Sequence, residues 1–182
     1  KEANARAKQL KAEGIKQTGR LLALFTERGV RKNTLVGVGL ATIGVIGFWG
    51  ISTWTPELLR SILDPTLPAL TKERYVSLAG MAQIIGGFFG ALCFAVVANR
   101  YGRRAAFALA LIGSSIIIPV TFHYTTAFTL ALAFFFAMGF ILLFFLSGFA
   151  IYFPELFPTR LRATGTGFCY NVARYLAAFF PA

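Results

Sequence analysis

The chain has 182 residues, of which 57% are hydrophobic, and a formal net charge of +11 at pH 7. With a mean hydropathy of +0.67, a soluble domain of this size would expose too much apolar surface, so we expect a membrane protein. The cations argue against a nucleic-acid-binding protein, because they lie in the gaps between apolar runs and not along one recognition face.

Residues 1–33 are polar and basic, with nine cations in the first 32 positions. They carry no secretory signal and do not start with methionine. The chain stops inside an apolar run at Pro181-Ala182, so we expect a fragment with both ends cut. A short amphipathic patch that fits a membrane surface is formed by Leu21, Leu22, Leu24, Phe25 and Val30.

Five apolar runs follow, each close to the roughly 20 residues that cross a bilayer as a helix. They predict membrane spans at about 35–55, 76–98, 105–122, 127–153 and 163–182. We therefore expect an all-α integral membrane protein, a bundle of about five transmembrane helices. In this interpretation residues 1–33 are a cytoplasmic loop and residues 34–182 form a truncated transmembrane domain.

The distribution of lysine and arginine predicts the orientation. With the N-terminus inside, the segments 1–33, 99–104 and 151–162 hold 14 cations. The segments 56–75 and 123–126 on the other side hold three. Because cytoplasmic loops carry the excess of lysine and arginine, we expect the N-terminal segment to be cytoplasmic.

A tight basic turn, Asn99-Arg100-Tyr101-Gly102-Arg103-Arg104, joins the second and third runs. Gly102 permits the sharp reversal, and the arginines can donate hydrogen bonds to helix C-terminal carbonyls and to carboxylates. The segment Ala95–Arg104 resembles the cytoplasmic loop signature of the major facilitator superfamily, roughly Gly-x-x-x-Asp-Arg-x-Gly-Arg-Arg/Lys. Ala95 replaces the first glycine of that signature, and Asn99 replaces its aspartate, which removes one charge.

A second motif, PELFPTRLRATGTG, runs from Pro154 to Gly167. We expect Pro154 and Pro158 to end the preceding helix, as Pro56 does after the first run. Three charged residues can pair across the cytoplasmic face: Glu155, Arg160 and Arg162. Two glycines let the next helix pack closely: Gly165 and Gly167. The motif resembles the loop between the tenth and eleventh helices of sugar and organic-acid transporters of the same superfamily.

With both motifs in place, the whole chain resembles the C-terminal half of such a transporter, and its five runs match helices seven to eleven. The resemblance implies proton symport of a small solute by alternating access. The Gly-Phe-Cys-Tyr-Asn run at 167–171 and the following Arg174 favour an organic acid, of the aromatic-acid, sialate or monocarboxylate type, over a neutral sugar. The resemblance also implies a bacterial inner (plasma) membrane location, a functional monomer, and a missing N-terminal half as partner. A sugar transporter of the superfamily and a non-transporting sensor or scaffold on the same fold remain alternatives.

Polar residues inside the runs are the candidates for substrate binding. Arg174, with Tyr170 and Asn171 beside it, is the clear ionisable residue inside a span; a snorkelling arginine is the competing interpretation. Weaker candidates are Gln83, Ser52 and Thr53, for which packing between helices is the alternative. No aspartate or glutamate lies deep in any run, so a proton-coupling carboxylate is expected in the missing half.

Enzymatic signatures are absent from the sequence. There are no paired carboxylates within a span and no HExxH or GxSxG motif, and the single histidine, His123, has no partner. Cys93 and Cys169 lie inside apolar runs without metal-ligand spacing. We therefore expect no enzyme, no metal site and no cofactor.

Overall fold

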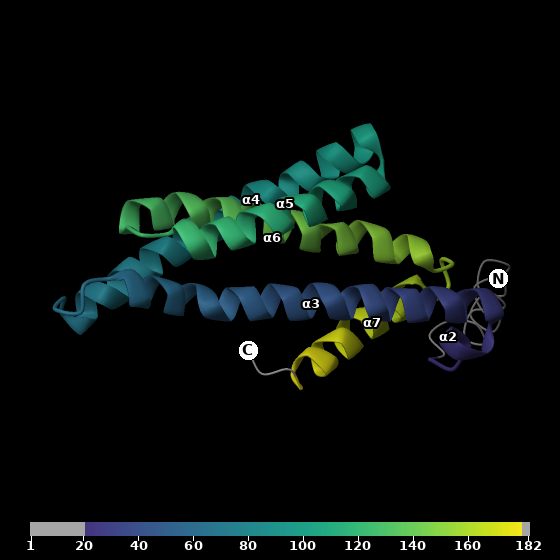
Figure 1. Cartoon of the computed structure of the whole chain (residues 1–182). Helices are drawn as coiled ribbons and strands as arrows, with labels where there is room; N and C mark the ends of the chain where they lie inside the picture. The colour runs from purple at the N-terminus through teal and green to yellow at the C-terminus, as the bar shows by residue number, and fades with distance from the viewer. Residues whose placement is uncertain (1–20, 180–182) are drawn as a thin grey trace, which may run out of the picture. The chain divides into compact units, whose positions relative to one another are not determined.

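The computed structural model describes residues 21–179. Most of the expected cytoplasmic loop 1–33, and the last three residues of the predicted fifth span, lie outside the described residues. Within 21–179 the secondary structure is helical, without strands (Figure 1). The helices are α2 (Ala23–Thr26), α3 (Arg28–Ile62), α4 (Ala69–Tyr101), α5 (Arg103–Tyr124), α6 (Phe128–Leu156) and α7 (Arg162–Ala177). The prediction of an all-α protein is confirmed.

Four of these helices, α3 to α6, are long and apolar enough to cross a membrane. They contain the first four predicted spans, except that α6 begins at Phe128. α3 has 35 residues, which corresponds to a length of about 52 Å at 1.5 Å per residue. Since a bilayer's hydrocarbon core is about 30 Å thick, the ends of a membrane-crossing α3 extend beyond that core. α7 has 16 residues, and its role as a membrane span stays a prediction.

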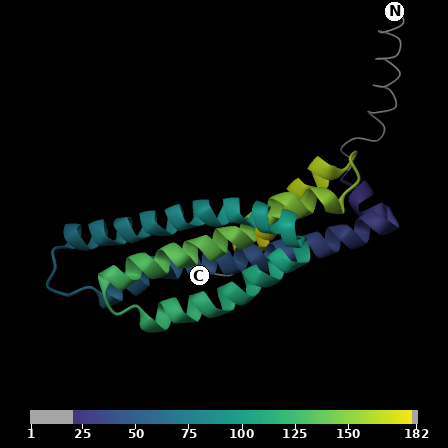
Figure 2. The same ribbon diagram turned by 90° about the horizontal axis from the view of Figure 1, so that it is seen from above.

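The contacts divide the chain into two compact units, which we describe separately. Unit 1 contains the described residues up to Ile43 together with 151–179, and thus α2, the first part of α3, the end of α6, and α7. Unit 2 contains residues 44–150, with the rest of α3, all of α4 and α5, and most of α6. Figure 2 shows the long helices of unit 2 running lengthwise beside one another.

The expectation that Pro56 and Pro154 end their helices is wrong. α3 continues past Pro56 to Ile62, and α6 continues past Pro154 to Leu156. A proline inside a helix removes one backbone hydrogen bond and favours a break. In α3 the continued helix buries Leu59, which is 0% exposed in the core of unit 2, and this burial offsets the lost hydrogen bond. Pro158 does lie beyond the end of α6.

The connections between the helices are shorter than the polar segments in the sequence indicated. α3 and α4 are separated by residues 63–68 and not by 56–75, and α4 and α5 by Gly102 alone. His123, expected in an outer loop, lies in the last turn of α5. Charged and polar residues at the ends of the apolar runs therefore extend the helices, because each added residue gains a backbone hydrogen bond.

Glycines bring α4 and α6 into close contact in unit 2. A methyl group on Gly86 would meet the carbonyl oxygen of Phe136, and one on Gly90 would meet that of Phe140. On the α6 side, a methyl group on Gly139 would meet the carbonyl oxygen of Gln83. The two helices thus touch backbone to backbone, as small residues allow in membrane bundles.

Candidate functional site

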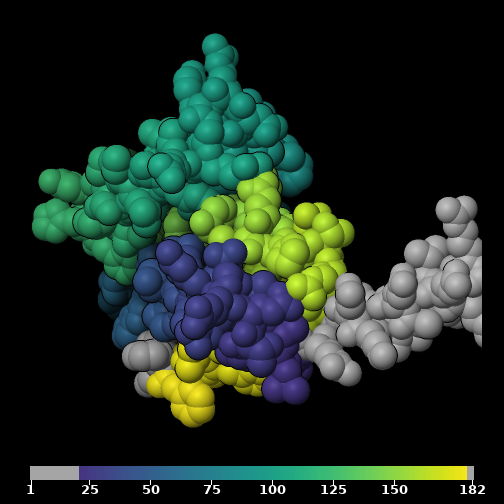
Figure 3. All heavy atoms as spheres, turned by 90° about the vertical axis from the view of Figure 1, so that its right-hand side faces the viewer, coloured from purple at the N-terminus to yellow at the C-terminus, as the bar shows by residue number. Residues whose placement is uncertain are grey.

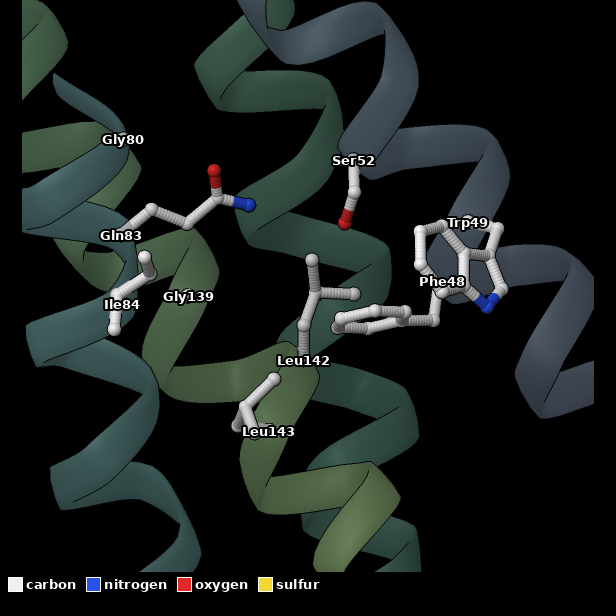
Figure 4. Close-up of a pocket in the computed structure, with 9 residues that line it drawn as sticks. All are labelled: Phe48, Trp49, Ser52, Gly80, Gln83, Ile84, Gly139, Leu142 and Leu143. Carbon is white, nitrogen blue, oxygen red and sulfur yellow. The ribbon is translucent and has the colours of Figure 1, made fainter. Parts of the chain in front are cut away.

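A pocket in unit 2 is built from three helices and has a volume of about 440 Å³ (Figure 4). α3 supplies Phe48, Trp49 and Ser52, α4 supplies Gly80, Gln83 and Ile84, and α6 supplies Gly139, Leu142 and Leu143. Sites for small ligands have volumes of about 300–1,000 Å³ and mostly apolar walls with a few polar groups. The pocket fits that description.

Two uncharged polar side chains, Gln83 and Ser52, point into the same space in this pocket (Figure 4). Both are half-buried. The carboxamide of Gln83 offers two N–H donors and one acceptor, and the hydroxyl of Ser52 can donate and accept. None of the nine lining residues carries a charge. The pocket can therefore hold an apolar group and hydrogen-bond an oxygen-bearing one.

Pro56 frees a main-chain carbonyl of α3. Since proline has no N–H, the main-chain carbonyl of Ser52, four residues earlier in α3, loses its regular intrahelical partner. Carbonyls freed in this way remain able to accept a hydrogen bond from a ligand or a water molecule. Because of Pro56, Ser52 therefore offers a main-chain acceptor in addition to its side-chain hydroxyl.

The third polar candidate next to the pocket, Thr53, does not line it. Its side chain is exposed, and its hydroxyl donates a hydrogen bond of 2.8 Å to the main-chain oxygen of Trp49 within α3. The structure thus brings together Ser52 and Gln83, which are 31 positions apart in the sequence, and leaves their neighbour Thr53 outside.

The candidates Arg174, Tyr170 and Asn171 lie on α7 in unit 1 and do not line the pocket. All three are exposed. The guanidinium carbon of Arg174 lies 6.0 Å from the ring centre of Tyr170, a cation–π distance. The amide of Asn171 donates a 2.8 Å hydrogen bond to the main-chain oxygen of Gly167.

The basic turn has the sharp geometry that its glycine predicted. Gly102, the one residue between α4 and α5, has φ +84°, a conformation that favours glycine. Arg100 lies in the last turn of α4, with its guanidinium carbon 5.6 Å from the ring centre of Tyr101. Arg103 and Arg104 open α5. Asn99 is exposed at the end of α4.

The second motif, Pro154–Gly167, is anchored to the start of α3 within unit 1. The guanidinium of Arg160 contacts the carboxylate of Glu27 at 2.5 Å, and the amide of Asn33 donates to the main-chain oxygen of Leu156 at 2.6 Å. Sequence reasoning missed both partners because they lie more than 100 positions away. Glu27 could have been noticed as the only acid in residues 14–33, which carry five cations.

Only one of the two glycines in this motif packs as expected. A methyl group on Gly165 would meet the ring of Phe157, whereas one on Gly167 would meet nothing within 4 Å among the described residues. A further close approach joins α3 to α7, where a methyl group on Gly37 would meet the sulfur of Cys169. Glycine at 37 and 165 therefore lets α7 approach its neighbours.

The α3–α4 connection in unit 2 is held by charged groups. Arg60 contacts both carboxylate oxygens of Glu73 at 3.1 Å and one of Glu57 at 2.5 Å. Asp64 accepts hydrogen bonds from the backbone N–H and the hydroxyl of Thr66. These bonds lower the pKa of Asp64, the backbone one contributing most.

Comparison with known proteins finds similarity to bacterial transport proteins. It is 28% identical to the cis,cis-muconate transport protein of Acinetobacter baylyi over 168 residues, 91% of this chain and 38% of the relative. It is 29% identical to a probable 4-methylmuconolactone transporter of Cupriavidus pinatubonensis, over 87% of this chain and 35% of the relative. The inner membrane metabolite transport protein YdjE of Escherichia coli is 25% identical over 90% of this chain and 34% of its own length.

The chain is related to bacterial metabolite transport proteins. This confirms the resemblance to major facilitator transporters drawn from the two loop motifs. The matched relatives are named as transport proteins and not as enzymes. The chain spans little more than a third of their length. No family model and no solved structure matches it.

Proposed function

We propose that this chain is the C-terminal half of a secondary carrier that moves a small organic acid across the bacterial inner membrane. The observation that carries the proposal is the pocket in unit 2, where Gln83 and Ser52 point into an otherwise apolar space between three helices. Relatives named for muconate and methylmuconolactone transport support the choice of an organic acid.

The solute's carbon skeleton would pack against Phe48, Trp49 and Leu142, while Gln83 and Ser52 hydrogen-bond its oxygens. These half-buried polar groups can discriminate between solutes, because a solute without matching groups leaves them unpaired. Since no lining residue is charged, the carboxylate needs a cation from elsewhere. The other half of the carrier is the candidate source, and the proton-coupling carboxylate would lie in that half.

Transport would proceed by alternating access, with the two halves of a functional monomer rocking around the solute. The N-terminal segment would face the cytoplasm, and with it the turn at Asn99–Arg104 and the motif Pro154–Gly167. Such a cycle needs two states of similar free energy, held by contacts that can break.

The test is uptake by the complete protein in proteoliposomes, with an imposed proton gradient and a panel of labelled organic acids and sugars. We expect gradient-driven uptake of an unsaturated or aromatic acid that stops when a protonophore collapses the gradient. Gln83→Ala and Ser52→Ala should each lower the uptake roughly tenfold, the effect of losing about 1.4 kcal/mol of solute binding. The matched control is Thr53→Ala, which removes the neighbouring hydroxyl outside the pocket.

Other outcomes would replace the proposal. Uptake of sugars alone would point to a sugar carrier, and solute binding without counterflow would point to a sensor or scaffold. Uptake that does not depend on the proton gradient would contradict proton symport. Equal losses in the Thr53 and Ser52 variants would show that the pocket does not select the solute.

A further inference from the structure

One end of unit 1 gathers exposed cations that the solute pocket does not use. Figure 3 looks onto this end, with α2 and the start of α3 in purple at the front. We call it the basic end. Its cations are Arg28, Arg31, Lys32, Arg160 and Arg162, all exposed.

Two long-range contacts hold the basic end together. Arg160 pairs with Glu27 just before α3, and Asn33 in the first turns of α3 donates to the oxygen of Leu156 at the end of α6. The α6–α7 connection is thereby fixed beside the start of α3. Cations from two distant parts of the sequence thus form one surface.

Among the described residues, carboxylates compensate only part of the charge of this surface. The same segments hold two carboxylates, Glu27 and Glu155; Glu27 is paired with Arg160, and Glu155 also has a partner. Within residues 21–179, Arg28, Arg31 and Lys32 make no ion pair with an acidic side chain. Exposed cations that are free of protein carboxylates attract anions from solution or from a membrane surface.

Exposed apolar side chains lie beside these cations in the chain. Leu21 is 55%, Leu22 75% and Phe25 43% exposed. Phe25 is fixed against Phe168 of α7, with ring centres 5.4 Å apart and edge to face. Apolar groups next to cations at the end of a membrane-length helix match the boundary between acyl chains and headgroups.

We propose that the basic end binds the headgroups of anionic phospholipids in the leaflet that meets the start of α3. Arg28, Arg31 and Lys32 contact the phosphates, and Leu21, Leu22 and Phe25 enter the acyl boundary. A free phosphate ion would satisfy the cations but leave the apolar side chains in water, which favours the lipid as the ligand. The proposal is independent of the solute that the pocket takes.

The experiment measures lipid retention by the complete protein, purified in detergent and titrated with phosphatidylglycerol or phosphatidylcholine, by native mass spectrometry. We expect preferential retention of phosphatidylglycerol that falls with rising salt. Replacing Arg28, Arg31 or Lys32 by glutamine should weaken phosphatidylglycerol binding roughly fivefold per cation removed. Arg28→Lys should keep the preference, and Arg74→Gln, which removes an exposed cation near the start of α4, is the matched control.

Equal retention of the two lipids would overturn the proposal, and so would an unchanged preference in the variant lacking all three cations. If that triple variant fails to insert, the single variants Arg31→Gln and Lys32→Gln give the same test. Inorganic phosphate that displaces the lipid at equal concentration would show an anion site without a lipid contribution. Leu22→Ser and Phe25→Ser, which keep every cation, should weaken lipid retention without altering the response to phosphate.

Discussion

The side-chain amide of Asn33 donates a 2.6 Å hydrogen bond to the main-chain oxygen of Leu156, the last residue of α6. The final carbonyls of a helix have no intrahelical donor. Asn33 supplies a donor to one of them from α3, 123 positions earlier in the sequence. It ties the start of α3 to the motif that follows α6. Unit 1 therefore depends on a single amide for part of its cohesion.

Replacing Asn33 by alanine should lower the free energy of unfolding by about 1–3 kcal/mol, since it leaves a half-buried carbonyl without its donor. The measurement is thermal unfolding of the purified protein in detergent. Asn99→Ala removes an exposed asparagine and should stay within about 0.5 kcal/mol of the wild type. Equal effects of the two substitutions would contradict the capping role.

Gly90 should tolerate no side chain. A methyl group there would meet the carbonyl oxygen of Phe140, so Gly90→Ala forces α4 and α6 apart and should cost about 1–3 kcal/mol or more. Gly80 is on the same helix with nothing within 4 Å of an added methyl group. Gly80→Ala should be neutral or slightly stabilising. Thermal unfolding of both variants checks the difference, and similar melting temperatures would refute it.

Arg103→Ala should leave membrane insertion intact but reduce uptake by the complete protein roughly tenfold, equivalent to about 1.4 kcal/mol. The reason is the proposed role of the basic turn in stabilising one state of the transport cycle. The assay compares uptake at equal membrane levels of protein, with Arg74→Ala as the control. Wild-type uptake by the Arg103 variant would remove this turn from the proposed gating machinery.

The α3–α4 connection should loosen in acid. Because hydrogen bonds from Thr66 depress the pKa of Asp64 below its ordinary value of 3.8, the stabilisation is complete above that value. It is lost as the pH falls through the lower pKa of the folded state. Hydrogen exchange at the Thr66 amide, corrected for its intrinsic pH dependence, should show protection that falls with acidification. Asp64→Asn should remove this pH dependence, and an unchanged acid response would contradict the assignment.

Much of the fold could be predicted from local properties of the sequence. Hydropathy located four membrane-length helices, because only helices or closed barrels satisfy the backbone in lipid. Gly102 marked the tightest turn, because a positive φ favours glycine. The helix ends were predicted less well, since Pro56 is a local signal for a stop while the burial of Leu59 depends on the other helices of unit 2.

The candidate site could also be predicted only in part from the sequence. The rarity of polar residues inside apolar runs singled out Ser52, Thr53 and Gln83 without any structure. The sequence does not show which of Ser52 and Thr53 enters the pocket. Their side chains point in directions about 100° apart, and the packing of the other helices decides which direction meets the pocket. The contacts of Glu27 and Asn33 were likewise invisible, because a long-range partner is set by how the helices pack.

The sequence by itself determined a helical membrane protein, its main spans and the two loop motifs, because hydropathy and turn chemistry act over neighbouring residues. Only the tertiary structure decided that Ser52 and Gln83 share a pocket and that Thr53 is excluded from it. The physical reason is the close contact of α4 and α6 at Gly86, Gly90 and Gly139. That contact sets the position and rotation of α4, and so directs Gln83 toward α3.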